Sequence, residues 1–156
     1  MMKSFKVYEM EYRGKAAATP DISLFQFSEE YYPQYEKIYN ECFHDMRKAL
    51  DIKPYDYYSD IEQLREKAGN IYLLLDGDTI IGSVVCFGTE IDDLIVNSAY
   101  QGRGYGKKLL LWAINHIRSY TEKPITLTVA QWNRRAVQLY ESAGLVITRT
   151  ETITFG

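Results

Sequence analysis

The stretch Asp92–Gly106, DDLIVNSAYQGRGYG, constrains the fold of this chain more than any other segment. Two acids open an apolar run typical of a buried strand, and a polar turn then leads into glycines at 102, 104 and 106. Apolar residues on one side of the segment from Gly104 to about Tyr120 predict a helix there. The first N–H groups of a helix lack partners and carry partial positive charge, so glycines at this point let an anion approach closely. The stretch therefore predicts a strand, a turn suited to phosphate, and a helix.

Two common phosphate-binding glycine motifs do not fit this turn. The dinucleotide fingerprint needs a third glycine five residues after the first, and counting from Gly102 that position is Lys107. The P-loop needs Gly-Lys-Ser/Thr, but Gly106-Lys107 is followed by Lys108, and no glycine stands five residues before Gly106. Neither motif is therefore present.

The rest of the chain predicts a mixed α/β fold. The Asp76-Gly77-Asp78 turn is a strong hairpin signal, Ser59 or Asp60 can cap a short helix, and Gly144 closes a later one. Antiparallel hairpins come first and helix-connected strands follow, which indicates an α/β (α+β) class with a mixed, mostly antiparallel central sheet flanked by helices. We expect one domain over residues 1–156. Strands are predicted over 5–12, 21–27, 71–75, 79–87, 90–96, 124–129 and 145–155 (one strand or a pair), and helices over 30–50, 61–68, 104–120 and 133–143.

Composition narrows the class of partner. A net charge of −3 and a pI of about 5.4 argue against a nucleic-acid partner. No basic leader precedes an apolar run, and no run reaches the roughly 18 apolar residues of a membrane span, so we expect a cytoplasmic protein with no membrane partner. The distant Cys42 and Cys86, with only two histidines in the chain, predict neither a disulfide framework nor a metal site.

The pattern that does fit is Gln101-x-x-Gly104-x-Gly106, and here the chain resembles the GNAT superfamily of acetyl-CoA-dependent N-acetyltransferases. In that family, Arg/Gln-x-x-Gly-x-Gly/Ala directly follows the fourth core strand, and its backbone amides hold the pyrophosphate of coenzyme A. A second segment, Asn133-x-x-Ala136-x-x-Leu139-Tyr140-x-x-x-Gly144-Leu145, resembles the family's later helix and the start of its next strand.

The resemblance runs from about Ile71 to Val146, and before residue 60 it rests only on the order of elements. The family often has proline where this chain has Ser98 and phenylalanine where it has Leu145, and neither change affects the expected cofactor site.

The resemblance implies a GNAT fold in which two neighbouring strands splay apart to form the coenzyme A cleft. It also implies acetyl-CoA as cosubstrate, with the pantetheine arm beside the strand at 90–96. The residues that it assigns to the cofactor are Leu94, Ile95, Val96, Gln101, Gly102, Arg103, Gly104, Tyr105, Gly106, Lys107 and Asn133. Asn133 can instead act only as a helix cap, and Lys107 can belong only to a solvated face.

The acids on the strand at 90–96 are candidates for a general base, because a protonated amine must lose a proton before it can attack. Strict alternation would place Glu90 and Asp92 on one face with Leu94 and Val96, and Asp93 with Ile95 on the other. Family members most often draw the base from the positions of Glu90 or Asp92, so we favour Asp92 and then Glu90. The alternative for each is a solvated acid at the end of a strand.

Two further groups complete the expected chemistry. A backbone N–H near Leu94–Val96 can stabilise charge on the thioester oxygen. Tyr140 matches the family's tyrosine acid, and a phenol of ordinary pKa is protonated at pH 7. The alternative for Tyr140 is a core aromatic on an amphipathic helix.

The sequence therefore predicts an N-acetyltransferase that moves acetyl from acetyl-CoA to a primary amine by direct attack. The acceptor is a small molecule or a protein amine, and a homodimer is common in the family. Tyrosines clustered before residue 59, beside acids, would suit a cationic acceptor, or they simply pack the core. The rival functions are a non-catalytic acyl-CoA-binding or sensing module, and a structural domain whose glycines form only a turn.

Overall fold

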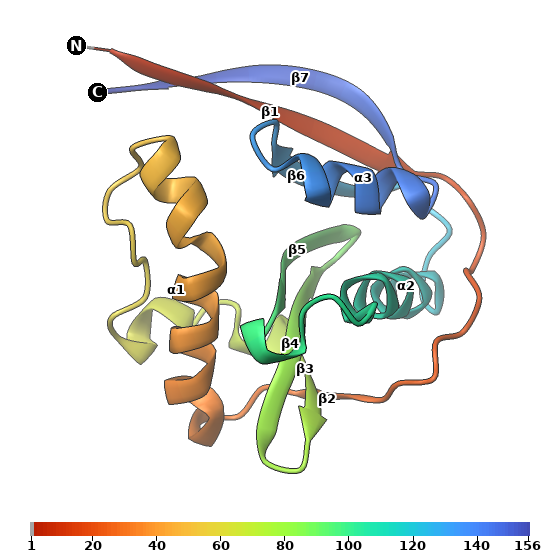
Figure 1. The fold of residues 1–156 in the computed structure, drawn as a ribbon. Coiled ribbons are helices and arrows are strands. Elements are labelled where there is room, and N and C mark those ends of the chain that lie inside the picture. The colour runs from red at the N-terminus through yellow and green to blue at the C-terminus, as the bar shows by residue number, and fades with distance from the viewer. Residues whose placement is uncertain (1) are drawn as a thin grey trace.

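A computed structural model describes residues 2–156, in which the chain forms a seven-stranded sheet with the order β2-β3-β4-β5-β6-β1-β7 (Figure 1). Neighbouring strands are antiparallel except β5 and β6, so the predicted mixed, mostly antiparallel sheet is confirmed. The strands are β1 (Lys3–Tyr12), β2 (Leu24–Gln26), β3 (Ile71–Asp76), β4 (Thr79–Phe87), β5 (Glu90–Val96), β6 (Ile125–Ala130) and β7 (Val146–Phe155). The helices are α1 (Tyr32–Ala49), α2 (Tyr105–Arg118) and α3 (Arg134–Ser142), with 3-10 turns η1 (Glu29–Tyr31), η2 (Ile61–Leu64), η3 (Ala68–Asn70) and η4 (Ser98–Tyr100).

The helices cover opposite faces of the sheet, with α1 on one side and α2 on the other (Figure 1). Each face therefore has its own buried cluster. The α1-side core consists of Tyr35, Ile38, Tyr58, Leu64, Ile71, Leu73, Ile80, Val85 and Ile95. The α2-side core consists of Met10, Leu74, Ile81, Val84, Cys86, Ile91, Leu109, Leu110, Ala113, Ile114, Ile117, Ile125, Leu127, Val129, Val137 and Leu145.

The expectation that hairpins come first is wrong for the first two strands. β1 pairs with β6 and β7, whereas β2 pairs with β3 at the other end of the sheet. The connecting segment runs along α2, where Ala17 donates its backbone N–H to Asn115 Oδ1 at 2.7 Å and Arg118 Nε donates to the Gly14 carbonyl at 2.8 Å. These contacts carry the chain from one end of the sheet to the other.

Two other elements are shorter than predicted. The strand expected over 21–27 keeps only the residues of β2, because just Leu24, Phe25 and Gln26 find partners on β3. The helix expected over 61–68 is the single 3-10 turn η2, which Asp60 caps by accepting from the Glu62 N–H at 3.0 Å.

The strict alternation predicted along β5 is also wrong, because this strand contains a β-bulge. Ser83 of β4 pairs with Ile95, but Val85 pairs with Asp92, so β5 holds one extra residue between these pairs. Asp93 lies within this bulge and has a left-handed backbone conformation, with a φ of +45°. Beyond the bulge, each side chain therefore points to the face opposite to the one that alternation continued from Asp92 would give.

As a result, the three apolar side chains Ile91, Leu94 and Val96 pack on the α2 side. Asp92, opposite Val85, and Asp93 instead lie on the α1 face with Ile95.

The fit of α2 on the sheet predicts that Gly82→Ala destabilises the protein. A Cβ at Gly82 would lie 2.7 Å from the Ile95 carbonyl oxygen and 2.8 Å from Leu109 Cδ1, so strand and helix would have to separate. We expect a loss of about 1–3 kcal/mol in the free energy of unfolding, measured by urea denaturation. Gly69→Ala is the control, because its Cβ would meet only Gln26 Nε2 at 3.9 Å. Equal stability of the two variants would contradict this packing.

Candidate active site

β5 and β6 separate almost as soon as they meet. Only Glu90 and Thr126 pair across them, although β5 continues to Val96 and β6 to Ala130. The bulge in β5 follows this pair, and a bulged strand bends and twists more strongly than a regular one. Among the described residues, the β6-facing edge of β5 beyond Glu90 therefore has no strand partner. The predicted splay is confirmed.

The glycine turn lies at the wide end of this gap, where α2 begins. Gly104 is the N-cap of α2 with a φ of +84°, and Gly102 has a φ of +79°. Both values lie in the left-handed region, where residues with a Cβ are strained. In the part of the chain that the structure describes, a Cβ at either position would meet no atom within 4 Å, and no side chain caps the helix. The helix start therefore presents backbone N–H groups to open space.

Side chains hold this turn against the end of β5. Gln101 Nε2 donates to the Val96 carbonyl at 3.0 Å, so in this structure Gln101 anchors the turn. Asn97 Oδ1 closes η4 by accepting from the Ala99 N–H at 3.1 Å. The exposed Arg103 guanidinium lies 5.5 Å from the Tyr100 ring centroid, on the solvent side of the turn. Arg103 lies between two of the glycines and forms no ion pair with the described residues.

The first turn of α2 also contacts α3. A Cβ at Gly106 would lie 3.4 Å from Leu139 Cδ2, so this glycine lets the two helices approach closely. Lys107 Nζ donates to Ser142 Oγ at 2.8 Å and joins the same helices. The half-buried Tyr105 packs against the α2-side core.

The side chains of β5, the strand predicted to lie beside the pantetheine arm, differ in burial and in the face on which they lie. Leu94 and Val96 are half-buried on the α2 face, the same face as the glycine turn. Ile95 is buried in the α1-side core, so it can reach a ligand in the gap only through its backbone.

α3 brings Asn133 and Tyr140 toward the site. Asn133 Oδ1 accepts from the Ala136 N–H at 3.2 Å, which confirms that Asn133 caps the helix. Tyr140 is half-buried against the α2-side core. Burial, and then the negative charges of Asp92 and Asp93, raise the pKa of Tyr140 to about 12. Its hydroxyl therefore keeps its proton at neutral pH.

The acids of β5 have different surroundings. Asp93 is paired with Lys67, whose Nζ lies 2.6 Å from Asp93 Oδ2, and the Asp93 side chain is only 10% exposed. Asp92 is open to solvent on one side, but surrounding protein still removes part of its hydration. This burial, followed by the charge of Asp93, raises the pKa of Asp92 to about 6. Glu90 is exposed at the narrow end of the gap.

Lys67 is a site neighbour that sequence reasoning missed, whereas Tyr39 belongs to the tyrosine cluster that the sequence suggested for a cationic acceptor. Burial lowers the pKa of Lys67, but the charge of Asp93 and the hydrogen bond to it outweigh burial and raise that pKa overall. The Tyr39 hydroxyl lies 3.4 Å from Asp93 Oδ1. No local pattern signals these contacts, because they depend on where the bulge turns Asp93.

The tyrosines of the N-terminal third divide between core and surface. Tyr35 and Tyr58 are buried in the α1-side core, and their hydroxyls have no hydrogen-bond partner among residues 2–156. Tyr57 is exposed, and its ring centroid lies 6.3 Å from that of Tyr39. Packing therefore accounts for the buried pair, whereas Tyr39 reaches Asp93 and Tyr57 lies beside Tyr39.

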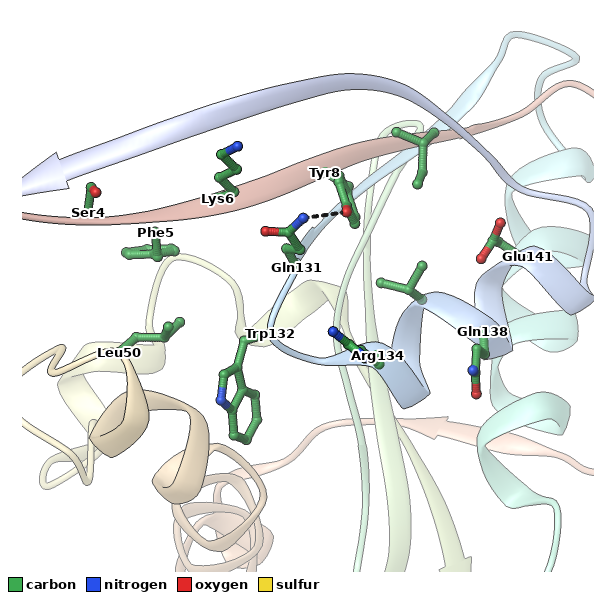
Figure 2. Close-up of a pocket in the computed structure, with 12 residues that line it drawn as sticks. Ser4, Phe5, Lys6, Tyr8, Leu50, Gln131, Trp132, Arg134, Gln138 and Glu141 are labelled. Atoms are coloured by element: carbon green, nitrogen blue, oxygen red, sulfur yellow. Dashed lines mark hydrogen bonds between the residues drawn. The ribbon is translucent and has the colours of Figure 1, made fainter.

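A cavity of about 920 Å³ is separate from the predicted residues (Figure 2). It lies between β1, the end of α1 and α3, and its lining includes Phe5, Leu50, Trp132 and Arg134. The acids and the glycine turn do not line it. We place the candidate site at the gap rather than at this cavity, because the gap alone combines open backbone N–H groups with titrating side chains.

In residues 2–156, no group of three or more His, Cys, Asp or Glu side chains is arranged to hold a metal ion. None of the helices in that range is sufficiently long and apolar to cross a membrane.

Comparison with known proteins identifies the family. Residues 26–145 match the model of the acetyltransferase (GNAT) family, so the chain belongs to this family. It is 29% identical to mycothiol acetyltransferase of Corynebacterium glutamicum over 92 residues. This alignment covers 56% of this chain and 32% of that protein. It is 32% identical over 117 residues to the ribosomal protein bS18-alanine N-acetyltransferase of Haemophilus ducreyi, covering 70% of this chain and 77% of that one.

A solved structure agrees with the fold. The NatC complex bound to Gag peptide and CoA superposes with a TM-score of 0.61 at 22% identity, covering 82% of this chain and 86% of the matched chain. The family model establishes the family, and the solved structure agrees with the fold. The chain spans only about a third of the mycothiol enzyme's length.

The surroundings of Asp92 predict that its carboxyl titrates near pH 6, which carbon NMR of the side chain can measure. Asp93→Asn should lower this pKa, because it removes the neighbouring negative charge and leaves Lys67 unpaired. Asparagine tolerates the left-handed backbone, so the bulge should persist. Asp78→Asn, in the β3–β4 turn, is the control. Titration of Asp92 near pH 4, or no response to Asp93→Asn, would contradict this description.

Proposed function

We propose that this protein transfers an acetyl group from acetyl-CoA to a primary amine. The observation that carries the proposal is the position of the open start of α2 beside the unpaired edge of β5. Membership of the GNAT family supports the same reaction class.

The residues around the gap fit coenzyme A. The backbone N–H groups from Gly102 to Lys107 would hold the diphosphate, since the two left-handed glycines leave open space that any Cβ would enter. The free edge of β5 would pair with the amides of the pantetheine arm, and Asn133 would contact the arm from α3. The bound cosubstrate supplies an acetyl group activated as a thioester.

Asp92 would act as the general base. Its pKa of about 6 leaves it mostly ionised at pH 7, yet close enough to neutrality to accept a proton efficiently. Asp93 is less suited to this role, because Lys67 already occupies its carboxylate. Glu90 remains the second choice, since it lies on the same strand but at the narrow end of the gap.

Tyr140 would act as the general acid. Its hydroxyl is protonated at neutral pH and senses the charges of Asp92 and Asp93 across the gap. A backbone N–H on the free edge of β5, near Leu94–Val96, would stabilise negative charge on the carbonyl oxygen. Base and acid thus stand on different elements.

The acceptor would approach from the α1 face, where Asp92 and Asp93 lie. Carboxylates and the rings of Tyr39 and Tyr57 suit a cationic amine. One relative is named for a ribosomal protein alanine and another for mycothiol, so we propose an amine of either a protein or a small molecule as acceptor. A non-catalytic acyl-CoA-binding module is less favoured, because it would need neither the raised pKa of Asp92 nor Tyr140.

If the glycine turn holds the diphosphate, one of two matched glycine variants should lose acetyl-CoA binding and the other should keep it. Gly104→Glu should abolish binding of acetyl-CoA, because its carboxylate would occupy the space for the diphosphate. Gly77→Glu, in the β3–β4 turn, has a comparable φ of +59° and open surroundings, and should bind normally. Acetyl-CoA at 100 times its Kd should stabilise the wild-type protein by about 2.7 kcal/mol in thermal unfolding. The same stabilisation in Gly104→Glu would contradict binding of the diphosphate at the glycine turn.

The acid role predicts that Tyr140→Phe lowers kcat about 100-fold or more, with little change in the Kd for acetyl-CoA. The assay follows thiol release across a panel of amines, and the wild-type protein should release thiol only when an amine acceptor is present. Tyr12→Phe serves as the control, because the Tyr12 hydroxyl donates to the Lys15 carbonyl, away from the gap. An unchanged kcat in Tyr140→Phe would remove Tyr140 from the mechanism.

A further inference from the structure

The N-terminal strand β1 extends beyond the end of its neighbour β6. On that side, the paired residues of β1 begin at Val7, opposite Ala130. One further bond joins the Gln131 N–H to the Lys6 carbonyl at 2.9 Å. Alternate residues of an antiparallel strand direct their backbone groups to the same side, so the N–H and C=O of Ser4 point the same way as those of Lys6. Among the described residues, no strand pairs with β1 at Ser4 on this side, so β1 has a short open edge there.

This open edge of β1 faces the cavity beside Trp132 (Figure 2). Three consecutive residues of the strand, Ser4 to Lys6, line the cavity, whereas a strand that turned only one face to it would contribute alternate residues. The cavity also adjoins the end of the gap, because two of its lining residues, Gln131 and Trp132, directly follow the last residue of β6. The open backbone groups and the candidate site are therefore neighbours.

The side chains around the cavity combine apolar surface with a cation. Phe5, Leu50 and Trp132 gather at the end next to α1, and Trp132 is 47% exposed (Figure 2). Exposed tryptophans are common anchors for binding partners. Arg134 lines the cavity as well and forms no ion pair with the described residues.

We propose that this cavity binds an extended peptide, which adds to the open edge of β1 at Ser4. The inference rests on the proposed function and names its acceptor. The free amino terminus of the peptide would lie in the gap, and the residues after it would occupy the cavity. The peptide would run away from the gap in the direction of β6, and therefore antiparallel to β1. A strand bound in this way gains affinity from backbone hydrogen bonds and specificity from pockets for its side chains.

The charges along this path match the two parts of such a peptide. Its cationic amino terminus would meet Asp92 and Asp93 on the α1 face. Beyond it, an apolar side chain would pack against Trp132, and an acidic side chain would face Arg134. A small amine would fill only the gap and would leave the edge at Ser4 unpaired, so the cavity favours a peptide.

Tryptophan fluorescence tests occupation of the cavity. The chain has two tryptophans, so Trp112→Phe leaves Trp132 as the only one. The probe is a hexapeptide amide with a free amino terminus and central phenylalanine and glutamate residues. We expect it to change the emission of Trp132 and to bind at least tenfold more tightly than alanine amide in a titration. Unchanged emission, or equal affinity for alanine amide, would overturn the proposal.

Charge reversal tests the contact with Arg134. Replacing the glutamate of the probe by lysine should weaken binding severalfold, and Arg134→Glu should reverse this preference. Lys123→Glu, an exposed site in the α2–β6 loop, is the control for net charge and should keep the wild-type preference. An unaltered preference in Arg134→Glu would contradict the predicted contact.

Two matched proline variants test the backbone pairing. Ser4→Pro removes the N–H on the open edge of β1 and should weaken binding of the hexapeptide roughly fivefold. Thr152→Pro is the control. Val7 directs its backbone toward Glu151 of β7, so the neighbouring Thr152 directs its own to the outer edge of β7, away from the cavity. Thr152→Pro should therefore bind the hexapeptide as the wild-type protein does.

Thermal unfolding will verify that both proline variants fold. If Ser4→Pro does not fold, N-methylation of each peptide residue in turn tests the same pairing from the side of the ligand, and one position should weaken binding to a similar extent. Binding that is indifferent to Ser4→Pro and to every N-methylation would overturn the strand pairing.

Stabilisation by acetyl-CoA separates this inference from the proposed reaction. A protein that acetyl-CoA stabilises, but that binds the hexapeptide no better than alanine amide, would overturn the peptide site alone. A protein that acetyl-CoA does not stabilise would overturn the proposed reaction, whereas the emission of Trp132 would still report whether the peptide binds.

Discussion

The bulge in β5 is the constraint on which the rest of the site depends. One extra residue near Asp93 bends the strand away from β6 just after their single pair, Glu90 and Thr126. The same residue reverses the faces, so that apolar side chains continue toward α2 while Asp92 and Asp93 turn toward α1. A left-handed backbone outside glycine costs on the order of 1–3 kcal/mol, although aspartate is among the residues that tolerate it best. The ion pair with Lys67 holds the Asp93 carboxylate in place at the bulge.

The bulge also separates the chemical roles of the titrating groups. Lys67 pairs with Asp93, while Asp92 stands beside that carboxylate and forms no ion pair with the described residues. The pKa of Asp92 rises to about 6, and that of Tyr140 rises to about 12. In the proposed mechanism, Asp92 would accept a proton at neutral pH and Tyr140 would donate one.

Local sequence signals predicted the parts of the site that depend on local geometry. The helix predicted to begin at the glycine turn does begin there, and Asn133 caps α3 as its position implied. The family motif around Gln101 was readable for the same reason, because a strand, a turn and a helix start follow one another directly in the chain.

The parts that could not be predicted depend on distant contacts. Alternation along β5 failed because the bulge is defined by its pairing with β4, which no pattern within 90–96 reveals. The Lys67–Asp93 pair spans 26 residues of sequence and exists only because of that bulge. Likewise, β1 reads as an ordinary strand, and its place between β6 and β7 follows from contacts made by the segment beside α2.

The most direct measurement of this account is a crystal structure of the protein with coenzyme A. The account predicts diphosphate oxygens about 3 Å from the backbone nitrogens of the turn between Gly102 and Lys107, with the pantetheine arm along the free edge of β5. A diphosphate bound instead in the cavity beside Trp132, or a β5 edge closed by protein in the complex, would contradict it.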